Sequence, residues 1–246
     1  MVQCLDVLFS SDESEDDPAL GLTPIPKTYL PMLQAIIRRP LIPSETPPIL
    51  VLLHGLGADE HDLMGLASEL DARLLVVSLR APLEYGPTGF AWFQINWDAD
   101  GIHVDASQVL ASRELLINTL KSLPEAVGAP ASPLFLAGFS QGAMMSLGVA
   151  LEEPALVKGV VCMSGRLVPE FLPPSRPSEV AKVPFLVQHG TGDDILPVTG
   201  SQLIRDCLEA IGCTVTYREY PMRHEIGRQS LADIRDWLDK HLPAAF

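Results

Sequence analysis

The feature that most constrains the fold is a regular alternation, from Ile49 onward, between short apolar runs and segments with helical periodicity. Continuous apolar runs at ILVLLH (49–54) and RLLVVSL (73–79) are typical of strands that are covered on both faces. A third run, LFLAGF (134–139), leads directly into a segment whose apolar residues recur at helical spacing. The alternation predicts an α/β fold with a mostly parallel central sheet covered by helices on both faces.

The rest of the chain continues this pattern and fits one domain. Further strands are expected at VKGVVCMS, PFLVQHG and TVTYREY, and helices over about 59–70, 105–123, 198–211 and 229–242. A length of 246 residues with 47% hydrophobic content is enough for one sizeable core. We therefore expect a single domain over residues 27–246. Residues 1–26 carry an acidic run that buries little surface, and we expect them to form a flexible leader.

Charge and composition exclude several classes of partner. The 31 acidic and 17 basic residues give a formal net charge of −14, which repels phosphate backbones, so no nucleic-acid partner is expected. No stretch approaches the ~20 apolar residues of a membrane span, and the apolar start has no Lys or Arg before it, so we expect neither an integral membrane segment nor a secretory signal. The four cysteines form no C-x-x-C pair, which favours reduced thiols in a cytoplasmic protein.

Ser140 lies at the junction between the run at 134–139 and the helical segment, with Gly138 and Gly142 on either side. A bare G-x-S-x-G pattern is weak evidence, but a strand-to-helix junction gives it a mechanical reason. There the turn must be sharp enough to expose the serine above the sheet, and it leaves no room for side chains at the flanking positions. The N-terminus of the new helix also directs free N–H groups toward a developing negative charge. We interpret Ser140 as a nucleophile.

A nucleophilic serine needs a base within hydrogen-bond reach, and the base needs a third group to orient it. His224 is the candidate base, because it lies in the loop between the last strand and the last helix. His189 ends a buried strand and is expected to be structural. Asp193 and Asp194 follow that strand and are both candidates for the third group. The chain order serine, acid, histidine is one of the known orders of a catalytic triad.

The oxyanion that forms on attack needs at least two hydrogen-bond donors. One is the backbone N–H of the residue after the nucleophile, Gln141. The other is expected from the segment LHGLGADEHDL (53–63), where two glycines let the backbone approach a ligand, and Leu56 is the natural donor. The alternative is that this segment only makes a strand-to-helix turn.

Aromatic residues gather in one expected loop, YGPTGFAWFQINWDADG (85–101). Because open α/β sheets bind ligands at the carboxyl ends of their strands, Phe90, Trp92, Phe93 and Trp97 are candidates for the wall of an apolar acyl pocket. A pocket of this kind predicts a preference for short to medium acyl chains. The alternative, which applies mainly to Trp92 and Phe93, is that they cap the core beneath the loop.

Five segments together resemble the phospholipase/carboxylesterase family, which includes the relatives of acyl-protein thioesterases. They are LLHGLGADEHDL, GFAWFQI, LAGFSQGAMMSL, HGTGDDILPV and YPMRHEI, and the resemblance covers about Pro48 to the C-terminus. It implies an α/β-hydrolase fold and a serine esterase that needs no cofactor and no metal. The long segment before about Lys27 departs from the compact family pattern, and the resemblance says nothing about its role.

The same resemblance assigns roles within the site. In the family's pattern the acid lies four residues after a His and four before a Pro, so His189 and Pro197 select Asp193 over Asp194. The implied site residues are the triad Ser140, Asp193 and His224, with oxyanion donors on the N–H groups of Leu56 and Gln141.

We therefore predict a serine carboxylesterase that hydrolyses esters with short to medium acyl chains through an acyl-enzyme intermediate. A lysophospholipase or an acyl-protein thioesterase is the alternative within the same class. The expected partner is a small-molecule ester or thioester substrate. The non-enzyme alternative is a catalytically silent hydrolase-fold protein that binds a partner. The residues do not separate these substrates, because pocket depth depends on packing, and they do not separate a monomer from a homodimer.

Overall fold

The computed structural model describes residues 22–24, 33–98, 101–172, 174 and 177–243. Its centre is an eight-stranded sheet with the order β1-β2-β4-β3-β9-β10-β11-β12. These strands are Leu22–Pro24 (β1), Ala35–Arg38 (β2), Ile49–Leu53 (β3), Leu75–Leu79 (β4), Leu134–Phe139 (β9), Gly159–Met163 (β10), Phe185–Gly190 (β11) and Val215–Tyr220 (β12). Only the pairs β1–β2 and β2–β4 are antiparallel, so the expected mostly parallel sheet is confirmed.

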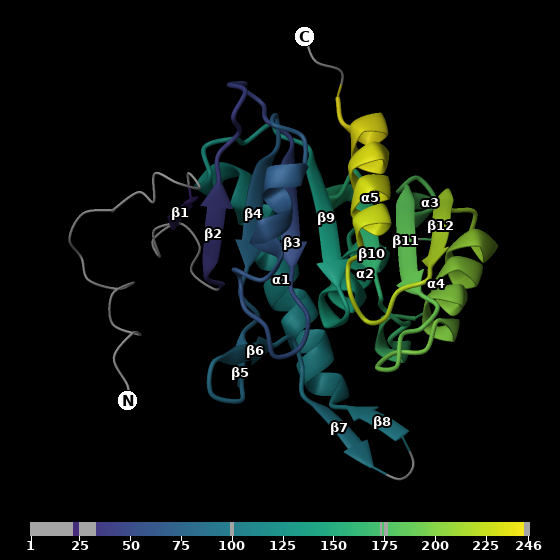
Figure 1. Ribbon diagram of the computed structural model, residues 1–246. Helices are drawn as coiled ribbons and strands as arrows, with labels where there is room; N and C mark the ends of the chain where they lie inside the picture. Colours follow the sequence, from purple (N-terminus) through teal and green to yellow (C-terminus); the bar gives the residue numbers. More distant parts are fainter. Residues whose placement is uncertain (1–21, 25–32, 99–100, 173, 175–176, 244–246) are drawn as a thin grey trace.

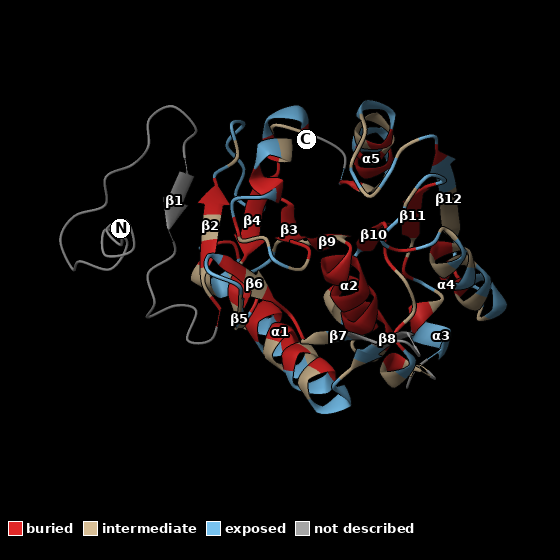
Figure 2. Cartoon of the chain, turned by 60° about the horizontal axis from the view of Figure 1, so that its bottom comes forward, coloured by how far each residue is buried: buried red, intermediate tan, exposed pale blue. Residues whose placement is uncertain are grey.

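Helices cover both faces of this sheet (Figures 1 and 2). The α-helices are Ala106–Ala126 (α1), Gln141–Glu152 (α2), Pro177–Val180 (α3), Thr199–Ala210 (α4) and Arg228–His241 (α5), and the 3-10 helices are Leu63–Glu69 (η1), Pro154–Leu156 (η2) and Pro169–Phe171 (η3). One hydrophobic cluster joins the sheet to η1 and α5, and a second joins its other face to α1, α2 and α4. The central strand β3 is buried at every position, as its continuous apolar sequence predicts.

Two segments differ from their expected structure. The helix expected over about 59–70 is a shorter 3-10 helix, because Asp59 bonds the backbone N–H of His61 and holds the preceding residues in a turn. The aromatic segment contains two hairpins instead of a loop, made by Leu83–Tyr85 (β5) with Gly89–Ala91 (β6), and by Ile95–Asp98 (β7) with Gly101–Val104 (β8). Gly86, with φ of 66°, permits the first reversal. The second hairpin projects from the body of the molecule (Figure 1).

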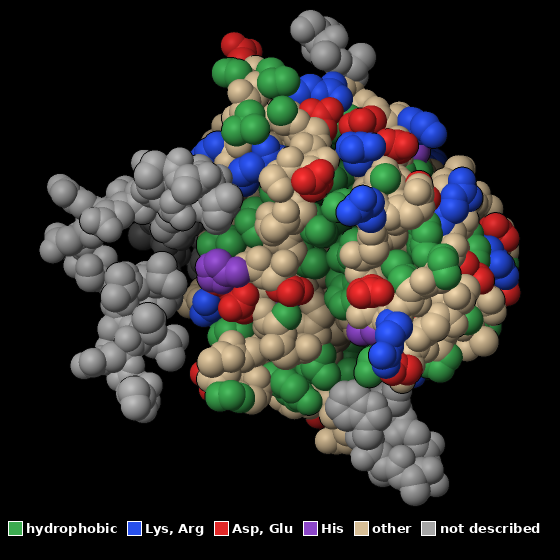
Figure 3. Space-filling view, in the orientation of Figure 1, with side chains coloured by type: hydrophobic (Ala, Val, Ile, Leu, Met, Phe, Trp, Pro, Cys, Tyr) green, Lys and Arg blue, Asp and Glu red, His purple; other side chains and the backbone are tan. Residues whose placement is uncertain are grey.

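The expected leader can be followed only in part. Strand β1 falls within residues 1–26 and pairs with β2 at the edge of the sheet, whereas the other residues of this segment lie outside the described part. The boundary at residue 27 therefore stays a prediction. No helix among the described residues is long and apolar enough to cross a membrane. On the face drawn in Figure 3, Lys and Arg side chains are interspersed with Asp and Glu and do not form one basic patch.

Candidate active site

Ser140 occupies a sharp turn between β9 and α2. Its backbone has φ of 53° and ψ of −115°, a conformation that is strained for any residue with a side chain. A Cβ atom at Gly138 would lie 2.2 Å from the carbonyl oxygen of Gly142, and one at Gly142 would lie 1.9 Å from that of Leu53. Both positions therefore require glycine. The N–H of Ser140 donates to the carbonyl of Met163 at 2.8 Å, which ties the turn to the end of β10.

The structure brings Ser140, His224 and Asp193 together from three separate loops. Ser140 Oγ lies 3.0 Å from His224 Nε2, and His224 Nδ1 lies 2.7 Å from Asp193 Oδ2. Ser140 follows β9, Asp193 follows β11, and His224 lies between β12 and α5. All three loops follow the carboxyl ends of parallel strands, so the sheet itself places them at one edge.

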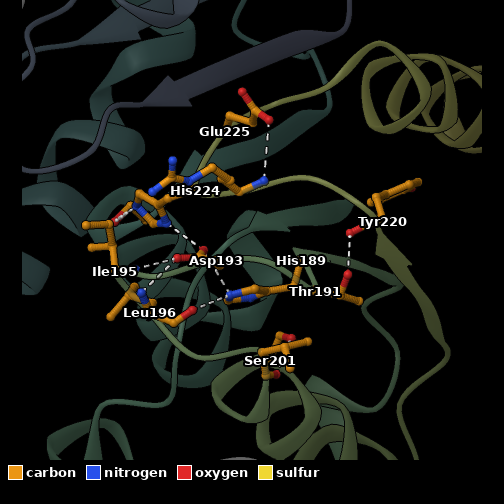
Figure 4. Close-up of polar contacts among 12 residues, drawn as sticks. His189, Thr191, Asp193, Ile195, Leu196, Ser201, Tyr220, His224 and Glu225 are labelled. Atoms are coloured by element: carbon orange, nitrogen blue, oxygen red, sulfur yellow. Dashed lines mark hydrogen bonds and ion pairs between the residues drawn. The ribbon is translucent and has the colours of Figure 1, made fainter.

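The Asp193 carboxylate is fully buried, and both of its oxygens have hydrogen-bond partners (Figure 4). Its Oδ1 accepts hydrogen bonds from the backbone N–H groups of Ile195 and Leu196, each at 2.9 Å. Burial acts to raise the pKa of Asp193, but the hydrogen bonds from His224 and from these two N–H groups outweigh it and hold the pKa below its ordinary value. Asp193 is therefore ionised at neutral pH.

His189 contacts the same carboxylate as His224 (Figure 4). Its Nε2 lies 3.1 Å from Asp193 Oδ2 and 2.8 Å from the carbonyl oxygen of Leu196. The side chain has no exposed surface. Sequence reasoning treated His189 only as a structural residue and missed its contact with the acid. The signal that could have indicated it is the four-residue spacing between the two residues.

Asp194 is placed differently from its neighbour. Its exposed carboxylate forms an ion pair with Arg223, and the hydrogen bond from that guanidinium lowers the pKa of Asp194. Of the two adjacent acids, only Asp193 forms a hydrogen bond with His224 among the described residues.

The two expected oxyanion donors lie in segments next to Ser140. Gln141 is the first residue of α2, where a backbone N–H has no partner within the helix. The structure gives the N–H of Leu56 no acceptor within the described part of the chain. A Cβ atom at Gly55 would lie 3.4 Å from Ser140 Cβ, so the segment carrying Leu56 runs directly beside the nucleophile. Gly57, whose φ is 81°, then turns the chain and donates to the carbonyl of Phe90 at 2.8 Å.

A buried chain of hydrogen bonds joins the turn at Ser140 to the segment carrying Leu56. The side chain of Gln141 accepts from the N–H of Trp92 and donates to the carbonyl of Phe93, both at 2.7 Å. The indole of Trp92 donates to the carbonyl of His54 at 3.0 Å. We call Gln141, Trp92, Phe93 and His54 the brace. Sequence reasoning assigned Gln141 a role only through its backbone, although a lone amide in an apolar helix start was a usable signal.

His54 has a fixed tautomer within the brace. Its Nε2 accepts from the backbone N–H of Ala81 at 3.0 Å, so the proton is on Nδ1, which donates to the carbonyl of Gly55 at 2.7 Å. Burial lowers the pKa of His54 and keeps the ring neutral. The ring therefore links the end of β4 to the segment before Leu56.

The aromatic candidates occupy different environments. Trp92 and Phe93 have no exposed surface, which favours the alternative that they cap the core. Phe90 is half-buried, with the guanidinium of Arg80 4.5 Å from its ring centre. The side chain of Trp97 lies outside the described part of the structure. Contact between these residues and an acyl chain stays a prediction.

Metal-binding and thiol chemistry have little support in the described residues. Asp59, Glu60 and His61 bring potential ligand atoms within 4.8 Å of one another, but both carboxylate oxygens of Glu60 accept hydrogen bonds from Arg80. The three cysteines in this part of the chain are free. Burial raises the pKa of Cys162 to about 12, which keeps that thiol protonated.

Comparison with known proteins decides the family. The model of the phospholipase/carboxylesterase family matches residues 42–242. The chain belongs to this family. It is therefore a carboxylic ester hydrolase, as the sequence predicts, and the expected α/β-hydrolase fold is confirmed.

Individual proteins are similar to the chain at moderate identity. Acyl-protein thioesterase 1 of Yarrowia lipolytica is 27% identical over 224 residues, which cover 84% of this chain and 96% of that protein. A probable carboxylesterase of rice (Oryza sativa subsp. japonica) is 29% identical over 163 residues, 63% of this chain and 59% of that protein. The crystal structure of esterase PE8 superimposes with a TM-score of 0.72 at 29% identity and covers 86% of this chain and all of that one.

Proposed function

We propose that the protein is a serine carboxylesterase that acts through an acyl-enzyme intermediate on Ser140. The observation that carries the proposal is the unbroken line of contacts from Ser140 Oγ to His224 and on to Asp193, at 3.0 and 2.7 Å. Each distance is within hydrogen-bond range, and the ends of the line have the chemistry of a nucleophile and of an orienting anion. The silent binding-protein alternative gives no reason for this arrangement.

In the acylation step, His224 Nε2 takes the hydroxyl proton as Ser140 Oγ attacks the carbonyl carbon of the ester. The tetrahedral intermediate carries its negative charge on the former carbonyl oxygen, which accepts hydrogen bonds from the N–H groups of Leu56 and Gln141. When the ester C–O bond breaks, His224 donates the proton to the leaving alcohol. The acyl group stays on Ser140.

In the deacylation step, water takes the place of the alcohol. His224 accepts a proton from the water as it attacks the acyl carbon, and the collapse of the second tetrahedral intermediate returns that proton to Ser140 Oγ and releases the carboxylic acid. Asp193 keeps its negative charge throughout and holds the imidazole with the proton on Nδ1, so that Nε2 is free to accept. The brace holds the segments that carry the N–H groups of Leu56 and Gln141 at fixed positions around the oxyanion.

The proposed substrates are small-molecule carboxylic esters with short to medium acyl chains. A thioester is the second candidate, and the observation that favours it is the match to an acyl-protein thioesterase over 84% of the chain. Hydrolysis of p-nitrophenyl esters from acetate to palmitate, beside matched S-acyl thioesters, tests both. We expect a maximum at short or medium chain length and complete loss in Ser140→Ala. Hydrolysis by Ser140→Ala at the wild-type rate would refute the mechanism.

A further inference from the structure

The loop after β10 has the same kind of strained turn as the loop after β9. Ser164 has φ of 51°, and Ser140 is the other non-glycine residue with positive φ in the described part of the chain. The two serines end neighbouring parallel strands. Ser164 is fully buried, and its Oγ has no hydrogen-bond partner within the described residues. Strain of this kind is maintained where the surrounding structure imposes it, and it clusters at functional sites.

This turn places Gly165 against the turn that carries the nucleophile and Arg166 against the start of α4. A Cβ atom at Gly165 would lie 2.9 Å from Ala143 Cβ and 3.7 Å from the carbonyl oxygen of Ser140, so Gly165 packs on the turn that carries the nucleophile. Arg166 follows, and its Cβ would lie 3.0 Å from a Cβ at Gly200 in the first turn of α4. Val168 is buried in the core. The backbone of Arg166 therefore lies between Gly165, which packs on the Ser140 turn, and the start of α4.

Arg166 has no counter-ion among the residues that the structure describes. Its side chain is half-buried, and its guanidinium forms no ion pair or hydrogen bond within the described part of the chain. Arg80 and Arg223, by contrast, are paired with Glu60 and Asp194. The positive end of the α4 dipole adds to the potential at this place. A guanidinium offers a planar fork of N–H donors that matches a carboxylate or a phosphate.

We propose that Arg166 binds an anionic group of the substrate, a carboxylate or a phosphate carried close to the scissile ester. This proposal rests on the proposed function at Ser140 and adds a substrate class to it, esters that carry a negative charge. The group supplies the counter-ion that Arg166 lacks within the described residues. The anion belongs either to the acyl part of the substrate or to the leaving alcohol, and both positions can be tested.

The experiment compares charged esters with neutral counterparts. One arm uses p-nitrophenyl hemisuccinate beside p-nitrophenyl pentanoate, with the charge on the acyl part. The other uses a monoacylglycerol phosphate beside the monoacylglycerol, with the charge on the leaving alcohol. Arg166→Gln is expected to lower kcat/KM for the charged member of one arm by about 10- to 100-fold, the effect of a lost charge-assisted hydrogen bond. The neutral members should change less than about 2-fold. The arm that responds identifies the position of the anion.

Two further variants separate binding from other effects. Lys158→Gln removes the same charge at the opposite end of β10 and should leave both arms unchanged. Arg166→Lys keeps the positive charge but lacks the planar set of N–H donors, and it should retain part of the preference for the charged ester. In the wild type, raising the salt concentration should weaken the preference for the charged ester.

The proposal is overturned if Arg166→Gln changes neither arm, or if it slows charged and neutral esters equally, since the second result means a structural role. If the salt dependence of the wild-type preference is absent, the proposal is overturned without any variant. If the proposed function itself is wrong, the result is a different one. The Ser140→Ala variant would then hydrolyse neutral esters as well as the wild type does.

Discussion

At the scale of single residues, the two adjacent acids after β11 differ in what they contact. Asp193 bonds His224 from a buried position, whereas Asp194 is exposed and paired with Arg223. We expect Asp193→Asn to lower kcat by about 10⁴-fold, because an amide in this place favours the wrong imidazole tautomer. Asp194→Asn is the matched control and should change kcat only modestly. The measurement is kcat for a neutral ester at pH 8, and a reversed ranking would move the acid to Asp194.

The same carboxylate predicts how stability depends on pH. The pKa of Asp193 is lower in the folded protein than its ordinary value of about 3.9. Its ionised form therefore contributes stability that is present above about pH 4 and is lost as the pH falls through the lowered folded value. Urea unfolding at pH 6 and at successively lower values should show that the wild type loses its advantage over Asp193→Asn in this acid range. An advantage that grows as the pH falls would contradict this account.

The contact between Asp193 and His224 could be anticipated from sequence because the motif fixes the acid by local spacing. The contact of His189 with the same carboxylate was missed, although its four-residue spacing from Asp193 was a usable signal.

At the scale of elements, the strand, turn and helix around Ser140 form one unit whose glycines have no space for a side chain. Gly142→Ala would place a Cβ 1.9 Å from the Leu53 carbonyl oxygen and should separate α2 from β3. We expect a loss of stability of several kcal/mol, in the range of severe overpacking. Gly65→Ala is the control, because nothing lies within 4 Å of a Cβ there. Urea denaturation of both variants checks this, and equal midpoints would contradict the packing argument.

The brace gives a second prediction at this scale. Gln141→Glu replaces the amide donor to the Phe93 carbonyl with a carboxylate, which has no proton to donate. The two oxyanion donors should then no longer be held at the right distance from each other. We therefore expect kcat to fall about 10- to 100-fold with KM little changed, the effect of a weakened oxyanion donor. Ser146→Ala removes another buried hydrogen bond from α2 and should leave kcat intact. A rise in KM alone would mean that the brace shapes the binding pocket instead.

These two features show how much of the site the sequence contains. The turn at Ser140 could be predicted because the glycines, the serine and the change of period are neighbours in the chain. The brace could not, because Gln141 reaches Trp92 across 49 residues and Trp92 reaches His54 across 38. The hairpins of residues 83–104 were also missed, because their pairing depends on turn geometry and not on hydrophobic period.

At the scale of the whole molecule, the parallel sheet explains why three distant loops meet. The sheet order, with β9 beside β10 and β11 beside β12, brings the ends of these strands to one edge, and residues 31 and 84 positions apart become hydrogen-bonded partners. The alternation of apolar runs predicted this architecture because doubly covered strands must be apolar throughout. It did not predict strand order, which depends on packing between segments far apart in sequence.

The central claim is that Ser140 is the activated nucleophile of this architecture, and covalent labelling tests it most directly. A fluorophosphonate reacts rapidly only with a serine that has its base in contact, so brief treatment followed by peptide mass spectrometry reports the nucleophile itself. We predict one labelled residue, Ser140, with labelling abolished in Ser140→Ala and strongly slowed in His224→Ala. Labelling that persists at another serine in Ser140→Ala, or wild-type protein that is neither labelled nor active on esters, would contradict the account.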